Sequence, residues 1–401
     1  MSEWKTYRLG DICTFVAGFA FKSKDFGNYP DKVIKIADIQ PPIVDMSSLT
    51  GIDISQYSSQ KLEKYKTEKG DYVLAMTGAT IGKLGRIVSE KKAYINQRVL
   101  LFKPIDKYID KNYLYYYLCQ NTFFSHIRNH IDSETAQPNI SANSIGEFTL
   151  TLPSLDEQRR IVGILGSLDD KIELNRRINA NLEAQAQALF KSWFVDFEPF
   201  RNDPFVDSEL GKIPQGWKVG DIYTYIDVIY GAPYKSALFN TDKKGYPLIR
   251  IRDLKTYSPQ FYTEEILPNT EYVDFGEIVA GMDAEFIPYI WKGEKGLLNQ
   301  RVCKFIPKYD YVSKYYILSL IRPELEFVQS YKVGTTVSHL GKSDIDKFKV
   351  ITPPAEIIKR FSNIVDSFHQ QIIQLAKENL NLSTLRDTLL PKLMTGEINI
   401  D

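Results

Sequence analysis

The chain has 401 residues, which is long for one compact domain and natural for two or more. Hydrophobic residues make up 43% and charged residues 25%, a composition typical of a globular protein and not of a disordered one. Lys plus Arg and Asp plus Glu both number 50, so the overall charge indicates neither a nucleic acid partner nor an acidic one.

The absence of long apolar runs and the sparse cysteines predict a cytoplasmic protein. No run of 18 apolar residues is present, and the first residues, MSEWKTYRLGD, lack the apolar core of a secretion signal. Cys13, Cys119 and Cys303 are far apart and form no CxxC motif. We therefore expect no membrane span, no disulfide framework, no structural zinc site and a reducing compartment.

The sequence contains an internal repeat. Trp4-Lys5 recurs as Trp217-Lys218, and the segment Gly18–Ser23 resembles Gly231–Ser236. The tetrad Asn-Gln-Arg-Val occurs at 96–99 and again, letter for letter, at 299–302. The order of the matching segments is kept, which predicts one unit of about 200 residues present twice.

The first part of each unit is predicted to be an α+β globular domain, at 1–153 and at 199–353. Short runs of β-type residues are separated by Gly, Pro, Asn and Asp, which is typical of strands joined by turns. One helix-like stretch interrupts the strands around Lys111–Cys119, and Ser313–Leu320 mirrors it in the second copy.

The last part of each unit, 154–198 and 354–401, is predicted to be a long helix. Apolar residues recur at alternating steps of four and three, with Asn175, Asn179 and Asn379 at seam positions and Arg386 as the one charged exception. A period of 3.5 residues predicts a coiled coil. Since the duplication suggests a pseudo-two-fold axis, we expect the two helices to pair antiparallel, with Asn175 opposite Asn379 fixing the register. The alternative is that each helix lies on its own domain. Pro391 is expected to end the second helix.

Common catalytic and metal-binding patterns are missing. The loop Thr77–Lys83 resembles a phosphate-binding loop, but only three residues separate Gly78 from Gly82, and Leu84 follows Lys83 where Ser or Thr is needed. His126 and His130 have a metal-like spacing without an accompanying carboxylate. No HExxH or GxSxG motif occurs, and neither does the Asn-Pro-Pro-Tyr loop of amino-methyltransferases. We expect a protein without catalytic residues or a metal site of its own.

The junction segments resemble the specificity subunit of a type I restriction–modification system, and the resemblance covers the whole chain. The segments that carry it are Leu152-Pro-Ser-Leu-Asp-Glu-Gln-Arg-Arg-Ile161, Leu189-Phe-Lys-Ser-Trp-Phe-Val-Asp-Phe-Glu-Pro-Phe200, Leu210-Gly-Lys-Ile-Pro-Gln-Gly-Trp217 and Leu389-Leu-Pro-Lys-Leu-Met-Thr-Gly-Glu-Ile398. One departure is Ile357-Ile358, where the first copy has Glu157-Gln158.

The resemblance implies that two target-recognition domains each read one half of a bipartite site in double-stranded DNA. It implies that the paired helices set the gap between the half-sites and dock two methyltransferase subunits. Restriction (translocase) subunits would complete the complex. S-adenosylmethionine, ATP and Mg²⁺ would then belong to the partner subunits, and this chain would hold no cofactor.

Loops at equivalent places in the two copies are the candidate DNA-contacting segments, because they combine basic, hydroxyl and amide groups that bind phosphates and base edges. The Thr77–Lys83 loop corresponds to the region Asp283–Trp291, where the copies diverge as two different readers should. The identical Arg98 and Arg301 are expected to contact phosphate or to support the fold. The candidate residues are Lys22, Ser23, Lys24, Thr77, Thr80, Lys83, Arg98, Thr135, Gln137, Asn139, Lys235, Ser236, Arg301, Thr335, Thr336, Ser338 and His339.

Two other classes of protein stay open at this stage. A fused restriction–modification enzyme would need catalytic motifs, which this chain lacks. A non-catalytic coiled-coil scaffold with two ligand-binding domains would show no salt-dependent affinity for DNA. Because the overall charge is neutral, we expect weak DNA binding by the chain without its partners.

Overall fold

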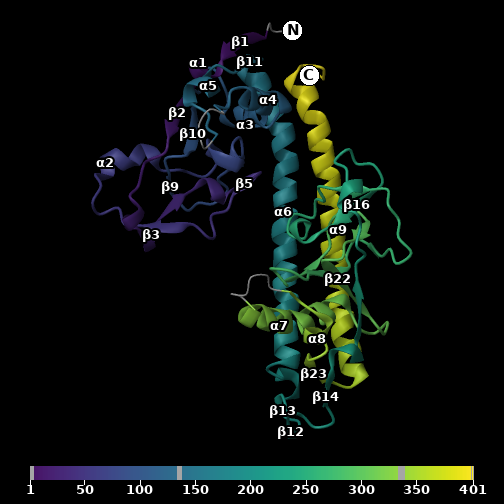
Figure 1. Cartoon of the computed structure of the whole chain (residues 1–401). Helices are drawn as coiled ribbons and strands as arrows, with labels where there is room; N and C mark the ends of the chain where they lie inside the picture. Colours follow the sequence, from purple (N-terminus) through teal and green to yellow (C-terminus); the bar gives the residue numbers. More distant parts are fainter. Residues whose placement is uncertain (1–3, 133–137, 333–338, 399, 401) are drawn as a thin grey trace. The chain divides into compact units, whose positions relative to one another are not determined.

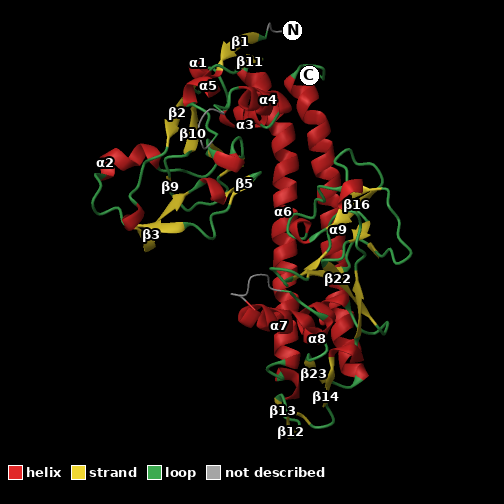
Figure 2. Ribbon diagram, viewed as in Figure 1, coloured by secondary structure: helices red, strands yellow, loops and turns green. Residues whose placement is uncertain are grey.

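The computed structural model describes residues 4–132, 138–332, 339–398 and 400 (Figure 1). The chain forms two compact units, one made of Met1–Asp170 with Ser383–Asp401 and the other of Lys171–Leu382. Each unit combines an α+β globular part with segments of two long helices (Figure 2). We call the globular part from β1 to β11 domain 1 and that from β12 to β23 domain 2.

Domain 1 is built on a mixed six-stranded sheet, flanked by a three-stranded sheet and a two-stranded antiparallel ribbon. The large sheet has the order β2 (Cys13–Ala17), β10 (Val99–Pro104), β7 (Tyr72–Ala75), β8 (Leu84–Arg86), β5 (Ile43–Val44) and β4 (Ile39–Gln40). The smaller sheets are β6 (Thr50–Ile52), β3 (Phe26–Ile34) and β9 (Tyr94–Ile95), and the ribbon β1 (Lys5–Arg8) with β11 (Thr149–Leu152). Its helices are α1 (Leu9–Ile12), α2 (Ser59–Leu62), α3 (Lys111–Leu118), α4 (Asn121–Asn129) and α5 (Ala142–Gly146).

Domain 2 has two four-stranded sheets and two ribbons. The sheets are β15 (Ile226–Tyr230), β22 (Val302–Pro307), β19 (Ile278–Gly281) and β20 (Pro288–Ile290), and β17 (Tyr262–Thr263), β16 (Tyr246–Ile249), β21 (Gly296–Leu298) and β18 (Tyr272–Val273). The ribbons are β12 (Phe205–Ser208) with β13 (Gly211–Pro214) and β14 (Lys218–Asp221) with β23 (Lys349–Thr352). Its helices are α7 (Lys314–Lys332) and α8 (Lys342–Ile345).

The strand pairings confirm the internal repeat. β1 pairs with β11 as β14 pairs with β23, and β2–β10–β7–β8 follows the same order as β15–β22–β19–β20. A short parallel pair also corresponds in the two domains, β3 with β9 and β16 with β21. Domain 1 has a second parallel pair, β5 with β8, where its large sheet continues beyond the shared four strands. The two domains therefore share these parts of their topology, and the loops between the shared strands can be compared.

A glycine holds the identical tetrads in place. Gly18 and Gly231 stand directly before the Phe19–Asn96 and Ala232–Asn299 bridges. A Cβ atom on Gly18 would lie 2.0 Å from the Asn96 carbonyl oxygen, and one on Gly231 would lie 2.2 Å from that of Asn299. Only glycine allows this close approach of two backbones, which explains why both copies keep it.

The two long helices are α6 (Leu155–Phe194) and α9 (Ala355–Met394), each of 40 residues. At 1.5 Å per residue each is about 60 Å long. The prediction that Pro391 ends the second helix was wrong, because α9 continues to Met394. Proline removes only one donor in the last turn, and the Thr395 N–H and Oγ1 both donate to the Pro391 carbonyl, at 3.0 and 2.9 Å.

Parts of both helices share a hydrophobic core with the globular domains. In the first unit Ile161 and Leu165 of α6 and Leu393 of α9 pack into the core of domain 1. In the second unit Phe190 of α6 and Phe361 of α9 pack into the core of domain 2. The alternative that each helix lies on its own domain thus describes only the first part of each helix, α6 on domain 1 and α9 on domain 2. The last part of each helix packs on the other domain, at Phe190 and at Leu393.

Within the second unit α6 and α9 contact each other through asparagines. Asn175 Nδ2 donates to Asn379 Oδ1 at 2.9 Å, as the periodicity predicted. Asn179 Nδ2 donates to the Ile372 carbonyl at 3.3 Å. The partners of rising residue numbers on α6 have falling numbers on α9, so these two segments run antiparallel. None of the helices in the described ranges has the length and apolar character needed to cross a lipid bilayer.

Candidate nucleic-acid interface

Three segments of domain 1 meet where β7 ends. The Met76 N–H donates to the Arg98 carbonyl at 3.0 Å, and the Met76 carbonyl accepts from the Ile140 N–H at 3.1 Å. Thr77 pairs with Asn139 in an isolated antiparallel bridge. The structure therefore brings together the predicted loop, the tetrad arginine and the segment before α5. We call Thr77, Thr80, Lys83, Arg98 and Asn139 cluster 1.

Domain 2 repeats this backbone arrangement. The Met282 N–H donates to the Arg301 carbonyl at 2.9 Å, and the Leu340 N–H donates to the Met282 carbonyl at 2.7 Å. Asp283 pairs with His339 in the corresponding bridge. We call Asp283, Arg301 and His339 cluster 2. Thr77, Arg98 and Asn139 of domain 1 thus correspond to these three residues in turn.

The residue after each bridge adopts a left-handed backbone conformation, at Gly78 with φ of 68° and at Ala284 with φ of 62°. Alanine is disfavoured there, so its surroundings must hold it. Gln329 of α7 does so, because its Nε2 donates to the Ala284 carbonyl at 2.9 Å and its Oε1 accepts from the Phe286 N–H at 2.7 Å. In domain 1 the Gly78 N–H donates to the Pro138 carbonyl at 3.0 Å.

Cluster 1 presents mainly uncharged polar groups beside two exposed cations. Thr77 is buried, Asn139 and Thr80 are half-buried, and Lys83 and Arg98 are exposed. The Thr80 hydroxyl donates to the Thr77 carbonyl at 3.1 Å, which tightens the loop. Arg98 is exposed, so it is not a buried structural arginine and its side chain can reach a ligand. Thr135 and Gln137 lie outside the described residues.

Cluster 2 is an ionic group. Arg301 Nη1 lies 3.2 Å from Asp283 Oδ2, and His339 Nδ1 lies 2.7 Å from Asp283 Oδ1. Arg301 and His339 are about half exposed, whereas Asp283 is only 20% exposed. Lys332 Nζ donates to the His339 carbonyl at 2.7 Å, which helps to hold this histidine in place. Thr335, Thr336 and Ser338 lie outside the described residues.

The third pair of candidate loops lies elsewhere in each domain. Lys22, Ser23 and Lys24 are exposed around a short 3₁₀ turn, above a core in which Phe21 packs against Tyr57. Lys235 and Ser236 are exposed at the corresponding turn, where the Lys235 N–H donates to Glu265 Oε2 at 2.8 Å. In the described parts of the chain, no hydrogen bond or ion pair joins these loops to cluster 1 or cluster 2.

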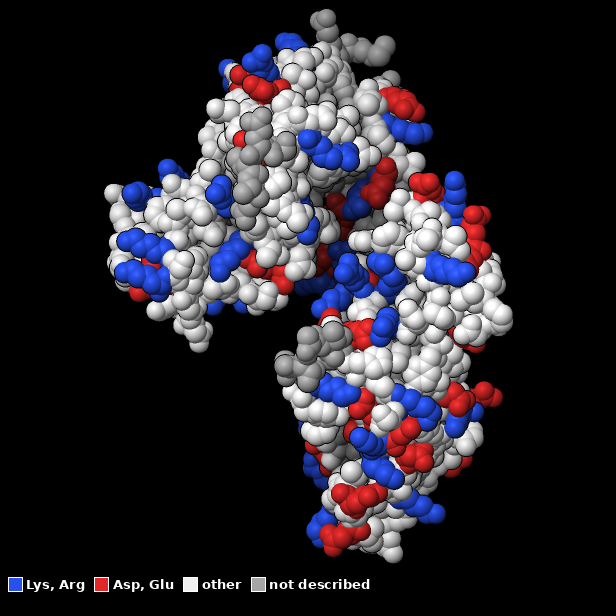
Figure 3. Space-filling view, viewed as in Figure 1, with Lys and Arg blue, Asp and Glu red and all other residues white. Residues whose placement is uncertain are grey.

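Because the chain has no net charge, the distribution of charged side chains over its surface is the relevant property for DNA binding. On the face shown in Figure 3, basic and acidic side chains are interspersed over the globular parts of both units. No broad single-sign field is visible on this face, in agreement with equal numbers of basic and acidic residues. On this face, recognition would depend on a few positioned groups.

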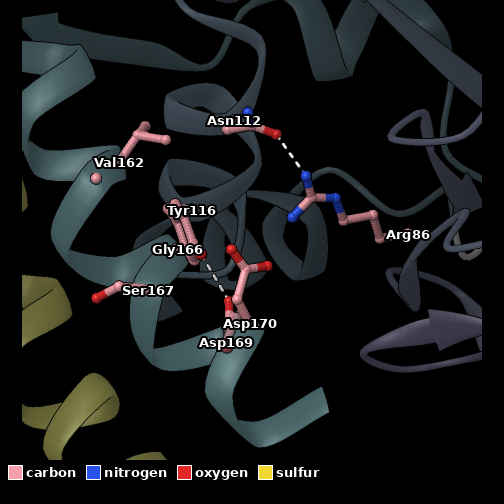
Figure 4. A pocket seen from close by; sticks show the side chains of 9 residues that line it. Arg86, Asn112, Tyr116, Val162, Gly166, Ser167, Asp169 and Asp170 are labelled. Atoms are coloured by element: carbon pink, nitrogen blue, oxygen red, sulfur yellow. Dashed lines mark hydrogen bonds between the residues drawn. The ribbon is translucent and has the colours of Figure 1, made fainter. Parts of the chain in front are cut away.

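Sequence reasoning missed a polar cavity of about 260 Å³ in the first unit, between domain 1 and α6 (Figure 4). Arg86 Nη2 donates to Asn112 Oδ1 at 2.6 Å, and the Tyr116 hydroxyl donates to Asp169 Oδ2 at 2.6 Å. Asp169 also forms an ion pair of 2.8 Å with Arg386. Arg386, the one charged residue in the apolar seam, could have revealed this site, because a charge among apolar residues needs a partner of opposite charge.

The possible phosphate-binding loop and the possible metal site were compared with the structure. The Thr77–Lys83 loop joins the antiparallel strands β7 and β8. It contains only the short 3₁₀ turn Gly78–Thr80 and does not lead into an α-helix, as a phosphate-binding loop would. His126 and His130 stack on each other with ring centroids 4.1 Å apart and bond to main-chain carbonyls. Among the described residues no group of three His, Cys, Asp or Glu side chains could hold a metal.

Comparison with known proteins agrees with these features. The family model described as "Type I restriction modification DNA specificity domain" matches residues 1–184 and 214–382, so the chain belongs to this family. The MjaIX type I restriction enzyme specificity subunit of Methanocaldococcus jannaschii is 28% identical, covering 95% of this chain and 97% of that protein. The HindI specificity subunit of Haemophilus influenzae is 25% identical, covering 99% of this chain and all of that protein.

The fold is shared with a solved structure. The crystal structure of a type I restriction–modification S subunit from M. genitalium has a TM-score of 0.50 and 16% identity, covering 98% of this chain and 96% of that one. The role of this chain is accordingly DNA sequence specificity in a type I restriction–modification system. It is the specificity component and not the catalytic one, in agreement with the sequence-based prediction.

Proposed function

We propose that domain 1 and domain 2 each read one half of a bipartite site in double-stranded DNA, through cluster 1 and cluster 2. One observation carries the proposal. The two clusters have the same main-chain hydrogen bonds around Met76 and Met282, but different side chains at Thr77 and Asp283 and at Asn139 and His339. A common frame with exchanged side chains is what two readers of different sequences require.

The exposed residues have the chemistry for this task. Lys and Arg bind phosphates, and Asn, Arg, His and Thr form hydrogen bonds with base edges. Lys83 and Arg98 supply the cations of cluster 1, and Arg301 supplies that of cluster 2. Lys22–Lys24 and Lys235–Ser236 lie apart from the clusters, so we assign them to the phosphate backbone.

The two long helices serve as a rigid spacer, an antiparallel coiled coil between recognition domains at 1–153 and 199–353. The asparagine contacts between α6 and α9 support this assignment. Two half-sites one turn of DNA apart are separated by about 34–36 Å, and helices of about 60 Å can hold two domains at that distance. A flexible linker would not hold the two domains at a fixed distance.

The outer faces of the same helices are the proposed docking surface for two methyltransferase subunits. The exposed side chains available for such contacts include Leu174 on α6, which is 50% exposed, and Ile364 on α9, which is 41% exposed. The restriction subunits would join through that assembly. S-adenosylmethionine, ATP and Mg²⁺ would act in those partners, in the cytoplasm, and this chain would bind none of them.

Co-production of this chain with the methyltransferase subunit encoded beside it tests the proposal. Long-read sequencing of the host DNA should reveal methylated adenines in a split, asymmetric motif with a fixed gap. The complex should bind a duplex carrying that motif with an affinity that falls steeply as salt rises. A continuous motif would contradict the bipartite reading. The absence of salt-dependent binding would favour the non-catalytic scaffold.

A further inference from the structure

Asp283 is the centre of cluster 2. Its two carboxylate oxygens are shared between Arg301 Nη1, at 3.2 Å from Oδ2, and His339 Nδ1, at 2.7 Å from Oδ1. Asp283 is mostly covered while both of its partners are about half exposed. The carboxylate is thus more covered than the two side chains that it contacts.

The backbone around Asp283 is rigidly held. Gly281 at the end of β19 is paired with Val302 at the start of β22, so the strand ends that carry Asp283 and Arg301 are in register. Ala284 follows in its left-handed conformation, held by Gln329. A side chain supported in this way loses little conformational entropy when it binds, which favours selective contacts.

The described residues of domain 1 include no such support for the tetrad arginine. The position of Asp283 is occupied by Thr77, and that of His339 by Asn139. In the part of domain 1 that the structure describes, no carboxylate oxygen lies within 4.0 Å of the Arg98 guanidinium nitrogens. The two tetrad arginines therefore share a backbone position but differ in the freedom of their side chains.

The geometry points to Asp283 as a positioning residue that presents Arg301 and His339 to a G·C base pair in the second half-site. This inference rests on the proposed function and makes its substrate more specific. Because Nη1 faces Asp283, Nε and Nη2 of Arg301 can donate as a fork to guanine O6 and N7. His339 bonds to Asp283 through Nδ1, so its Nε2 is the ring nitrogen that would face a base. Arg98, without a carboxylate partner, contacts phosphate and selects no base.

The test uses the full chain co-produced with its methyltransferase subunit. Methylation motifs are mapped for the unaltered chain and for Asp283→Asn, Asp283→Glu, Arg301→Ala and Arg301→Lys. Asp274→Asn is the matched control, because Asp274 forms an exposed ion pair of 3.1 Å with Lys295 in the same domain. The half-site whose recognition changes in Arg301→Ala is assigned to domain 2.

We expect a G·C pair at a fixed position in that half-site. The preference for it should fall by about 10- to 100-fold in Asp283→Asn and Arg301→Lys, the range that one paired base contact provides. Asp283→Glu should recover part of it, since it restores the carboxylate, and the other half-site and the control should be unchanged. A residue that only supports the fold would lower methylation at all sites equally.

Three results would overturn the inference: a second half-site without a G·C pair, an unchanged preference in Asp283→Asn, or an equal loss over all sites in both variants. If Asp283→Asn does not co-purify with the methyltransferase subunit, Arg301→Lys provides the test, because lysine keeps the positive charge but lacks the two parallel N–H donors of arginine. Failure of the proposed function looks different, since the motif of the unaltered chain would then not be split into two halves.

Discussion

Asn175 and Asn379 are joined by a hydrogen bond of 2.9 Å between the Nδ2 of the first and the Oδ1 of the second. Around them, Asn179 Nδ2 donates to the Ile372 carbonyl at 3.3 Å, and Asn379 Nδ2 donates to the Ile172 carbonyl at 3.4 Å. Asn179 and Asn379 are equivalent positions of the repeat, and so are Ile172 and Ile372, so each of the last two bonds is the counterpart of the other. The two helix segments are thus related by a local two-fold axis, and side-chain hydrogen bonds follow this symmetry. These hydrogen bonds specify the register of the helices, which a purely apolar seam would not.

The asparagine contacts should lower the free energy of unfolding, although they specify the register of α6 against α9. Oδ1 of Asn175 is buried and, among the described residues, has no hydrogen-bond partner. We expect Asn175→Leu with Asn379→Leu to raise the free energy of unfolding by about 1–2 kcal/mol, because an unsatisfied acceptor is replaced by apolar packing. Urea unfolding measures the change. Asn181→Ala, on the exposed face of α6, is the control, and a lower stability of the double variant would contradict the expectation.

The glycines that line the cavity of the first unit should be replaceable. Gly163 and Gly166 lie within α6, and nothing lies within 4 Å of a Cβ atom built on either. Alanine has a higher helix propensity than glycine by about 0.8–1.0 kcal/mol. We therefore expect Gly166→Ala to stabilise the chain by nearly this amount in thermal unfolding. Destabilisation would show that the cavity is smaller than the geometry indicates.

Gly18 should behave in the opposite way. A Cβ atom there would lie 2.0 Å from the Asn96 carbonyl oxygen, and backbone at this distance has no flexible end that can move aside. We expect Gly18→Ala to lower the free energy of unfolding by about 3 kcal/mol, as severe overpacking does. Hydrogen exchange should locate the loss in domain 1. Equal protection of domain 1 in this variant and in the unaltered chain would be the contrary outcome.

His369 gives the second unit a pH-dependent stability. Burial, with a smaller effect of Lys314 and Lys292, lowers the pKa of His369 from 6.5 to about 4. The unfolded chain therefore binds a proton on this residue between pH 6.5 and 4 that the folded chain does not bind. Stability is fully present above pH 6.5 and decreases as the pH falls, by roughly 3 kcal/mol at pH 4.

Unfolding measured at a series of pH values between 7.5 and 4 tests this contribution. His369→Gln removes the titrating group and should flatten the decrease that the unaltered chain shows below pH 6.5. The replacement itself lowers stability at neutral pH, because His369 packs edge-on against the Tyr315 ring. Only the slope against pH is therefore compared. Parallel slopes in the two proteins would rule out His369 as the source.

Much of the fold could be predicted from the sequence, because repetition and periodicity are properties of the chain itself. The tetrad Asn96–Val99 and its copy revealed the two domains, and the seam placed Asn175 opposite Asn379. Pro391 was misjudged because a proline in the last helical turn removes a single hydrogen bond. The ends of the helices were also unexpected, since the apolar seam does not reveal that Phe190 and Phe361 pack into domain 2.

The candidate site was predicted only in outline. Equivalent loops could be named because the repeat aligned them, and the structure brings Thr77, Arg98 and Asn139 together as cluster 1. The pairing of Asp283 with Arg301 and His339 depends on contacts between residues far apart in a region where the copies diverge. No local pattern specifies such contacts. The loops at Lys22 and Lys235 also stand at equivalent places in the repeat, but sequence alone does not show that they lie apart from the two clusters.

Methylation mapping of two reciprocal variants, Asn139→Ala and His339→Ala, tests the central claim most directly. Asn139 and His339 occupy equivalent positions in the two clusters, so each variant alters one proposed reader and leaves the other intact. We predict that each substitution relaxes the sequence requirement in one half of the split motif, a different half for each, with the gap unchanged. Changes in the same half, or equal effects on both halves, would contradict the assignment of one half-site to each domain.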